Sequence, residues 1–157
     1  GRYAWDKLKM NLPVIGQILE KIYLARFARN LATLVAGGIP IIQALRIISE
    51  IINNVIYRDI LLDVAMQVTN GKSVGESLAK YKQFPPLVTQ MVKVGEQTAQ
   101  LDTILLKLAT FYEKEVDAKV GMLSSLLEPI IMLILGLGVG ILVAGVLLPI
   151  YNLASAV

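Results

Sequence analysis

Hydrophobic residues recur every three or four positions along roughly the first 120 residues, which is the period of an amphipathic α-helix. One such stripe consists of Leu24, Phe27, Ala28, Leu31, Leu34 and Val35. It ends at Gly37 and Gly38, because glycine adopts the left-handed conformation that closes a helix without steric cost. No stretch sustains the period-two alternation of a half-buried strand. The pattern therefore predicts an all-α fold.

Breaks in this pattern divide the next part of the chain into further helices. Pro40 suits the first turn of a helix. The apolar face of the helix that follows Pro40 consists of Ile41, Leu45, Ile48, Ile52 and Val55. We expect another helix over about Asp59–Asn70, and then a short one that begins with the capping-box pattern of Ser73 and Glu76.

Two more helices complete the expected bundle. Pro86 is placed to begin a helix that reaches about Val94, where Gly95 interrupts it. A long helix follows from about Ala99 to Leu127, with an inward face made of Leu101, Leu105, Leu108, Tyr112 and Val116. The links are short, which favours antiparallel neighbours in a compact six-helix bundle.

The end of the chain follows a different pattern. Residues 130–148 are 19 consecutive uncharged residues, 13 of them Leu, Ile or Val, and no charged residue follows them. A helix of this length spans about 28 Å, close to the ~30 Å hydrocarbon thickness of a bilayer. A core helix of a soluble domain normally carries a polar stripe, which this run lacks. We therefore expect one C-terminal transmembrane helix rather than a buried helix.

These patterns divide the chain into four parts. They are a basic juxtamembrane segment (1–19), a helical cytoplasmic domain (20–127), a transmembrane helix (128–150) and a short non-cytoplasmic tail (151–157). Residues 1–29 carry six basic and two acidic side chains. Because basic residues beside a span mark its cytoplasmic side, we expect the body in the cytoplasm and the C-terminus beyond the membrane. Nucleic-acid binding is disfavoured, since basic and aromatic residues do not interleave on a recognisable scaffold.

The residue types present exclude most catalytic chemistry. There is no His and no Cys. A Ser-His-Asp triad, a Cys-His pair, a thiolate zinc site and a disulfide are therefore all impossible. A Ser-Lys dyad needs a serine beside a lysine in a pocket, and nothing in the pattern places Ser73 or Ser77 so. We expect no enzymatic activity and no cofactor. A hard cation on clustered carboxylates stays an open alternative.

Small residues follow two faces of the expected membrane helix. Gly136, Gly140 and Ala144 repeat every four residues, while Gly138 and Gly145 lie on the opposite side. A small-xxx-small row lets another helix approach closely in lipid. The alternative is the ordinary enrichment of glycine in membrane helices. These glycines do not match a dinucleotide-binding fingerprint, which also needs a strand-turn-helix context.

Charged residues on the helical body are candidates for partner docking. We select Arg46, Glu50, Glu113 and Glu115. The alternative is a solvated face on which Glu115 pairs with Lys119 one turn later.

Glu128 and Pro129 mark the expected membrane edge. An ionisable group at this depth is a candidate functional residue. A carboxylate in the first turn of a helix also complements the helix dipole, and we favour that structural role.

Several short motifs, in order along nearly the whole chain, resemble the type II secretion F domain. They are Leu12–Gly16, Ala25–Leu34, Gly37–Pro40, Phe84–Pro86, Gly95–Gln97, Leu101–Asp102, Phe111–Val116, Leu127–Pro129 and Leu148–Tyr151. The residues Gln97–Gln100 depart from the family's usual acidic and glycine pattern.

The resemblance implies a six-helix cytoplasmic bundle that occurs twice in a longer protein with three membrane helices. This chain would hold the second bundle and the last span. The implied function is an inner-membrane platform of the type IV pilus machine, or alternatively of a type II secretion system. The implied partners are a cytoplasmic hexameric ATPase, pilin or pseudopilin subunits, other inner-membrane assembly proteins, further copies of the chain and the bilayer. A membrane-anchored adaptor of unrelated machinery is a more distant alternative.

Overall fold

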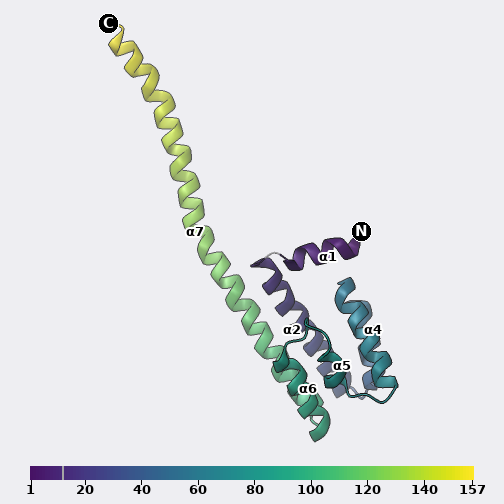
Figure 1. The fold of residues 1–157 in the computed structure, drawn as a ribbon. Helices are drawn as coiled ribbons and strands as arrows, with labels where there is room; N and C mark the ends of the chain where they lie inside the picture. Colours follow the sequence, from purple (N-terminus) through teal and green to yellow (C-terminus); the bar gives the residue numbers. More distant parts are fainter. Residues whose placement is uncertain (12) are drawn as a thin grey trace. The chain divides into compact units, whose positions relative to one another are not determined.

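The computed structural model describes residues 1–11 and 13–157, and this part of the chain contains helices and no strand. The helices are α1 (Arg2–Asn11), α2 (Ile15–Ala36), α3 (Ile41–Ile51), α4 (Val55–Thr69), α5 (Val74–Leu78), α6 (Pro86–Thr98) and α7 (Leu101–Ser155) (Figure 1). The predicted all-α class is confirmed. The chain forms two compact units, Gly1–Asp117 and Ala118–Val157, and α7 contributes to both.

The first unit has a buried apolar core built from α2 to α6 and the beginning of α7. Its largest fully buried side chains are Tyr57, Phe27, Leu24, Leu31, Leu45, Ile48, Leu61, Leu78, Leu105, Leu108, Val64 and Val74. Phe84 lies among them, with its ring centroid 5.1 Å from that of Phe27 and 5.7 Å from that of Tyr57, both edge to face. Helices too short to be stable alone are thereby held by tertiary packing.

Helix α1 lies in the segment of residues 1–19, to which the sequence pattern assigned no helix. It packs against α2 and α4. The carboxylate of Asp6 accepts a hydrogen bond from the backbone N–H of Val55 at 3.1 Å, which joins α1 to the start of α4. Leu12, the first residue of one family motif, lies outside the described residues.

The boundary between α3 and α4 differs from the prediction. The apolar periodicity continued to Val55, but α3 ends at Ile51, and Asn53 adopts a left-handed conformation with φ 53°. Asn54 then caps α4, because its Oδ1 atom accepts from the backbone N–H groups of Ile56 (2.9 Å) and Tyr57 (3.1 Å). Asparagine suits both positions, and this local signal outweighed the hydrophobic period.

The expected interruption of a helix at Gly95 is wrong. Helix α6 continues through Gly95 and ends at Thr98, and the cap residue Ala99 that follows is left-handed with φ 53°. Gly95 is buried, and a Cβ atom there would lie 3.0 Å from the Cα atom of Leu101. This glycine therefore permits close approach of the chain at the start of α7 rather than ending a helix.

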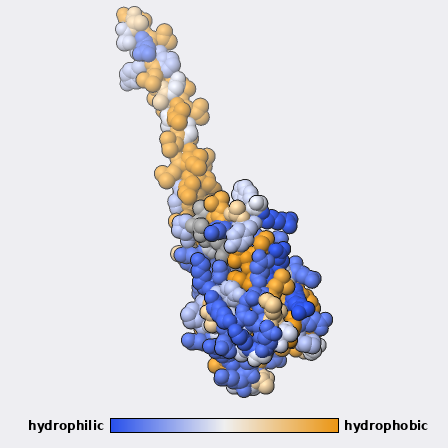
Figure 2. All heavy atoms as spheres, turned by 45° about the vertical axis from the view of Figure 1, so that its right-hand side comes forward, coloured by the Kyte–Doolittle hydropathy of each residue, from blue (hydrophilic) through white to orange (hydrophobic). Residues whose placement is uncertain are grey.

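The second unit consists of the remainder of α7 and the end of the chain. Its most apolar 18-residue window has a mean hydropathy of 2.9 and none of it is buried within the structure. Figure 2 shows hydrophobic atoms following this helix, while hydrophilic atoms cover much of the visible face of the first unit. By length and composition, α7 is a candidate membrane span.

Pro129 and Pro149 lie inside α7. A proline has no backbone N–H and therefore removes one hydrogen bond between successive turns of a helix. Helix α7 nevertheless continues past both prolines. Glu128 consequently lies in the interior of α7 and not in a first turn, since α7 begins at Leu101. This contradicts the interpretation of its carboxylate as a partner of an N-terminal dipole. Its position at a membrane edge stays a prediction.

Candidate docking surfaces

The structure separates the four charged residues selected from the sequence into two pairs. Arg46 and Glu50 lie on α3, whereas Glu113 and Glu115 lie on the first part of α7. Arg46 and Glu50 line a groove formed with α4. Glu113 lines a different groove, formed with α2.

The first of these surfaces, the α3–α4 groove, combines charged and apolar groups. It is lined by Arg46, Ser49, Glu50, Arg58, Asp59, Leu62, Asp63, Met66 and Thr69. The side chains of Leu62 and Met66 are 45% and 56% exposed. Arg58 forms an ion pair with its neighbour Asp59 at 3.1 Å. A partner protein can therefore bury apolar surface in this groove and form ion pairs with both basic and acidic side chains around it, as in ordinary protein interfaces.

One acidic group at this groove is held in its charged form. The hydroxyl of Tyr81 and the side-chain amide of Gln67 both donate to Asp63. These hydrogen bonds lower the pKa of Asp63, while burial and the hydrogen bond to Asp63 raise the pKa of Tyr81 to about 12. The groove therefore presents a fixed negative charge at neutral pH.

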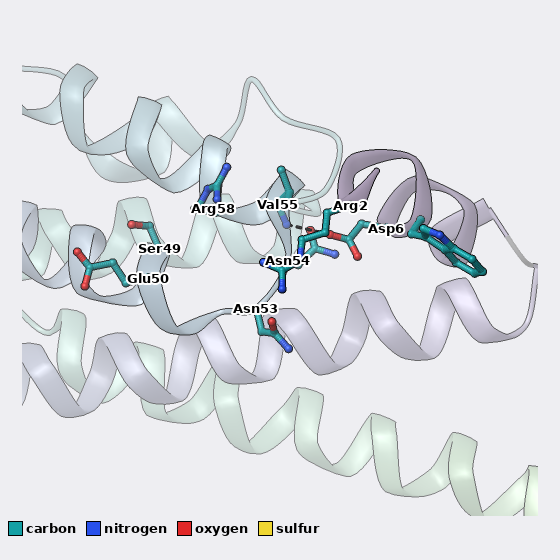
Figure 3. A pocket seen from close by; sticks show the side chains of 9 residues that line it. Arg2, Asp6, Ser49, Glu50, Asn53, Asn54, Val55 and Arg58 are labelled. Carbon is teal, nitrogen blue, oxygen red and sulfur yellow. Dashed lines mark hydrogen bonds between the residues drawn. The ribbon is translucent and has the colours of Figure 1, made fainter.

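A polar pocket adjoins the groove where α4 begins (Figure 3). Its lining shares Ser49, Glu50 and Arg58 with the groove. The first backbone N–H groups of α4 are already occupied by Asp6 and Asn54. The helix start consequently offers no array of free donors to an anion, and the pocket extends the docking surface instead.

The two glutamates on α7 form a second surface, which we call the α2–α7 seam. Arg29 donates from Nε to Glu113 Oε1 at 2.9 Å and from Nη2 to Oε2 at 2.7 Å, a two-pronged ion pair. Lys21 donates to Glu115 Oε2 at 2.8 Å. The hydrogen bond from Arg29 lowers the pKa of Glu113. The structure therefore gives both glutamates partners on α2, and a docking role for them stays a prediction.

Sequence reasoning missed Glu96, whose carboxylate caps α5. Its Oε1 atom accepts from the backbone N–H of Val74 at 2.6 Å, and its Oε2 atom from that of Gly75 at 3.0 Å. Ser73 caps the next donor as predicted, since its Oγ atom accepts from the N–H of Glu76 at 3.1 Å. No local pattern announces the role of Glu96, because it belongs to a different helix.

Tyr57 is a buried polar residue that the sequence did not single out. It is fully buried, and its hydroxyl has no protein hydrogen-bond partner among the described residues. Burial raises the pKa of Tyr57 and also that of Glu20 on α2. No group of three or more His, Cys, Asp or Glu residues positioned to hold a metal occurs in residues 1–11 and 13–157.

The small residues of α7 line a shallow groove on that helix. Gly136, Gly140 and Ala144 lie along it, between Met132, Leu133, Leu137 and Ile141. A Cβ atom at Gly136, Gly138, Gly140 or Gly145 would meet nothing within 4 Å. These positions have room for a partner, and helix packing at them stays a prediction.

Comparison with known proteins finds one matching family and several relatives that align with nearly the whole chain. Residues 27–149 match the family described as type II secretion system (T2SS), protein F. The chain is 41% identical over 157 residues to type IV pilus assembly protein PilC of Myxococcus xanthus and 40% over 154 residues to the protein of that name from Thermus thermophilus. It is 34% identical over 156 residues to type II secretion system protein F of Pseudomonas aeruginosa. The alignments cover 100%, 98% and 99% of this chain but only 38% of each relative.

Proposed function

Because the chain belongs to the type II secretion system protein F family, we propose that it is part of the inner-membrane platform of a type IV pilus assembly machine. The observation that carries this proposal is the higher identity to relatives named for pilus or fimbrial assembly, 36–41%, than to those named for type II secretion, 30–35%. The alternative is the corresponding platform of a type II secretion system. In either machine it would act as a scaffold without catalytic chemistry of its own.

In this proposal α7 crosses the inner membrane, with the unit Gly1–Asp117 in the cytoplasm and the C-terminus on the other side. The apolar window of α7, unburied in the structure, supports the span. The excess of basic residues before it and the absence of charge after Glu128 support the orientation.

Helix α7 contributes to both units of the chain. Its first part contributes Leu105, Leu108 and Tyr112 to the buried core, and the same helix continues without interruption into the apolar segment. The ion pairs of the α2–α7 seam hold this first part against α2. We propose that force applied to the first unit reaches the membrane through this helix, because a continuous helix is far stiffer than a loop.

The α3–α4 groove is the proposed docking surface for the cytoplasmic ATPase. Exposed Leu62 and Met66 supply apolar surface, and Arg46 and Glu50 at its rim supply charges that are not committed to the seam. In the membrane, the row of Gly136, Gly140 and Ala144 is the proposed contact for pilin helices or for a second copy.

Gene disruption tests the function as a whole. Loss of surface pili, with type II secretion unchanged and restored piliation on complementation, is the expected result. Loss of secretion with normal pili would transfer the protein to the alternative machine.

Charge reversal tests the docking surface. In the full-length protein, Arg46→Glu combined with Glu50→Arg should reduce copurification of the ATPase several-fold. Lys107→Glu, an exposed residue on α7 outside the groove, should leave it unchanged. Equal recovery of the ATPase with both variants would remove the groove from the proposal.

A further inference from the structure

An apolar strip follows the outer surface of the first unit where α6 and the first part of α7 lie side by side, and we call it the α6–α7 strip. It consists of Leu87, Met91 and Val94 on α6 and of Ile104 and Phe111 on α7. Leu87, Val94 and Phe111 are 44%, 50% and 46% exposed, while Met91 and Ile104 are half-buried. Single exposed apolar residues are ordinary, but a row on each of two neighbouring helices forms a continuous surface.

The backbone places these two rows next to each other. Leu87 and Val94 are seven positions apart, as are Ile104 and Phe111, so each pair lies on one side of its helix. Val94 precedes Gly95, where a Cβ atom would lie 3.4 Å from the Cδ1 atom of Ile104. Because the link between the two helices is only two residues long, α7 returns along α6, and Phe111 lies toward the Leu87 end of the strip.

The charged side chains at the edge of the strip are basic. Lys107 and Lys114 lie one helical turn before and after Phe111, and both are exposed. Neither lysine takes part in an ion pair within the part of the chain that the structure describes. Their charges are therefore available to a partner.

The acidic side chains of the same two helices lie away from the strip or are already paired. Glu96 accepts from backbone N–H groups of α5, and Glu113 and Glu115 form ion pairs with α2. Asp102 and Asp117 are not three, four or seven positions from either strip residue of α7, so they lie on other sides of that helix. The strip is consequently apolar with a positively charged edge.

We propose that the α6–α7 strip binds an acidic amphipathic helix of a partner protein, with Asp or Glu side chains of that helix against Lys107 and Lys114. Two parallel rows of apolar residues fit the apolar face of a third helix, whose contacts recur every three or four positions. Opposite charge at the edge selects the partner and fixes its orientation. This partner is distinct from the ATPase of the proposed function, because neither α6 nor α7 lines the α3–α4 groove.

Two other occupants fit this surface less well. A second copy that met the strip with its own strip would bring lysines against lysines, since a two-fold interface pairs the same patch of both subunits. A lipid surface ordinarily meets tryptophan or tyrosine at the border of an apolar face, and the strip contains neither.

A designed peptide tests the chemistry of the partner. The probe is a labelled synthetic helix of about 18 residues, or about five turns, with Leu on one face and Glu along both borders of that face. Its affinity for the full chain in phosphatidylcholine nanodiscs is measured by fluorescence anisotropy. We expect a peptide with Lys in place of Glu to bind about tenfold more weakly, and Lys107→Glu combined with Lys114→Glu to weaken the acidic peptide about tenfold.

Matched variants locate the binding surface. Val94→Gln should weaken the acidic peptide about fivefold, because it removes apolar area from the strip. Leu106→Gln changes a residue that is 47% exposed on another side of α7 and should leave the affinity unchanged. Lys72→Glu, an exposed residue between α4 and α5, is the control for charge. Equal thermal unfolding of all variants shows that they fold alike.

Other outcomes overturn the inference. Equal affinity for the acidic and basic peptides, or undiminished binding by the double lysine variant, would refute the acidic partner helix. Equal binding of the peptide to nanodiscs without protein would assign the affinity to lipid. Absent peptide binding, with an oligomer that Val94→Gln dissociates, would assign the strip to a second copy. Each of these results leaves the ATPase groove untouched, because copurification of the ATPase is measured separately.

Discussion

Glu96 on α6 accepts a hydrogen bond from the backbone N–H of Val74 on α5 at 2.6 Å, although the two residues are 22 positions apart. Helix α5 has only five residues, so its start depends on donors being satisfied from outside. A carboxylate at a helix start also complements the partial positive charge there. The position of α5 against α6 is thus maintained by a cap that spans two helices.

Replacing this carboxylate should loosen α5. We expect Glu96→Ala to destabilise the first unit by about 1–3 kcal/mol, because two partly buried N–H groups lose their acceptor. Hydrogen exchange at the amides of Val74 and Gly75 should accelerate in the full chain in detergent. Gln97→Ala, an exposed substitution on the same helix, is the control. Unchanged exchange at both amides would show that water replaces the carboxylate at no cost.

Gly75 permits the same two helices to approach. A Cβ atom at Gly75 would lie 2.8 Å from the carbonyl oxygen of Thr89 and 2.9 Å from the backbone nitrogen of Lys93. These are backbone atoms, so the helices must separate, and Gly75→Ala should cost about 1–3 kcal/mol in the free energy of unfolding. Gly37→Ala meets its nearest atoms at 3.4 Å and should stay within about 1 kcal/mol of the parent chain. Equal melting temperatures for the two variants would contradict this account.

The hydroxyl of Tyr57 should cost stability rather than add it. Its ring packs 5.0 Å from that of Tyr23 and 5.7 Å from that of Phe84, contacts that phenylalanine retains. Tyr57→Phe removes a buried hydroxyl without a protein partner, and we expect a gain of about 1 kcal/mol. Tyr81→Phe removes the hydrogen bond to Asp63 and should lose about 1 kcal/mol. Thermal unfolding of the two variants measures both changes in stability. A loss of stability in Tyr57→Phe would indicate that the Tyr57 hydroxyl has a hydrogen-bond partner in solution.

The α2–α7 seam should make stability depend on acid. The hydrogen bond from Arg29 lowers the pKa of Glu113 below its ordinary 4.5, so folding favours the charged form. The contribution of the pair is therefore complete above the unfolded pKa and is lost as pH falls through the lower folded pKa. The stability difference between the parent chain and Glu113→Gln should shrink as pH falls from about 7 to about 3.

Two comparisons make this pH measurement interpretable. Asp117→Asn, an exposed acid one turn farther along α7, is the control. Glu20 acts in the opposite direction, because burial raises its pKa, so its contribution is present at low pH and is lost as pH rises through the raised value. A pH-independent difference for Glu113→Gln would exclude the ion pair as its source.

The small-residue row of α7 is tested by adding bulk. Gly140→Leu adds bulk to the shallow groove that Gly136 and Ala144 line, where an added Cβ atom meets nothing within 4 Å, so the substitution should disturb a partner helix rather than this chain. We expect several-fold weaker oligomerisation in membranes and reduced piliation. Val139→Leu, which adds bulk at the adjacent position, is the control. Normal oligomers and pili with Gly140→Leu would remove the row from the proposed mechanism.

Some boundaries were misjudged although a local signal was present. Hydrophobic periodicity carried the expected helix past Ile51, but Asn53 and Asn54 are residues that favour a left-handed turn and a helix cap. At Gly95 the error was the opposite one, since we expected a helix to end where α6 continues. Glycine occurs both in turns and where two backbones pack closely, so the residue type alone does not distinguish them. Its role followed only from the position of Leu101.

The sequence by itself determined the helical class, the end of α2 at Gly37 and Gly38, the cap at Ser73, the apolar segment of α7 and the family. Each of these depends on residues within a few turns of one another or on composition, and helix formation and partition into lipid respond to such local properties. Only the tertiary structure decided the cap by Glu96, the anchoring of α1 by Asp6 and the pairing of Arg29 with Glu113, which are 84 residues apart. The physical reason is that a side-chain oxygen or a charge carries no mark of its partner until the core has brought the helices together.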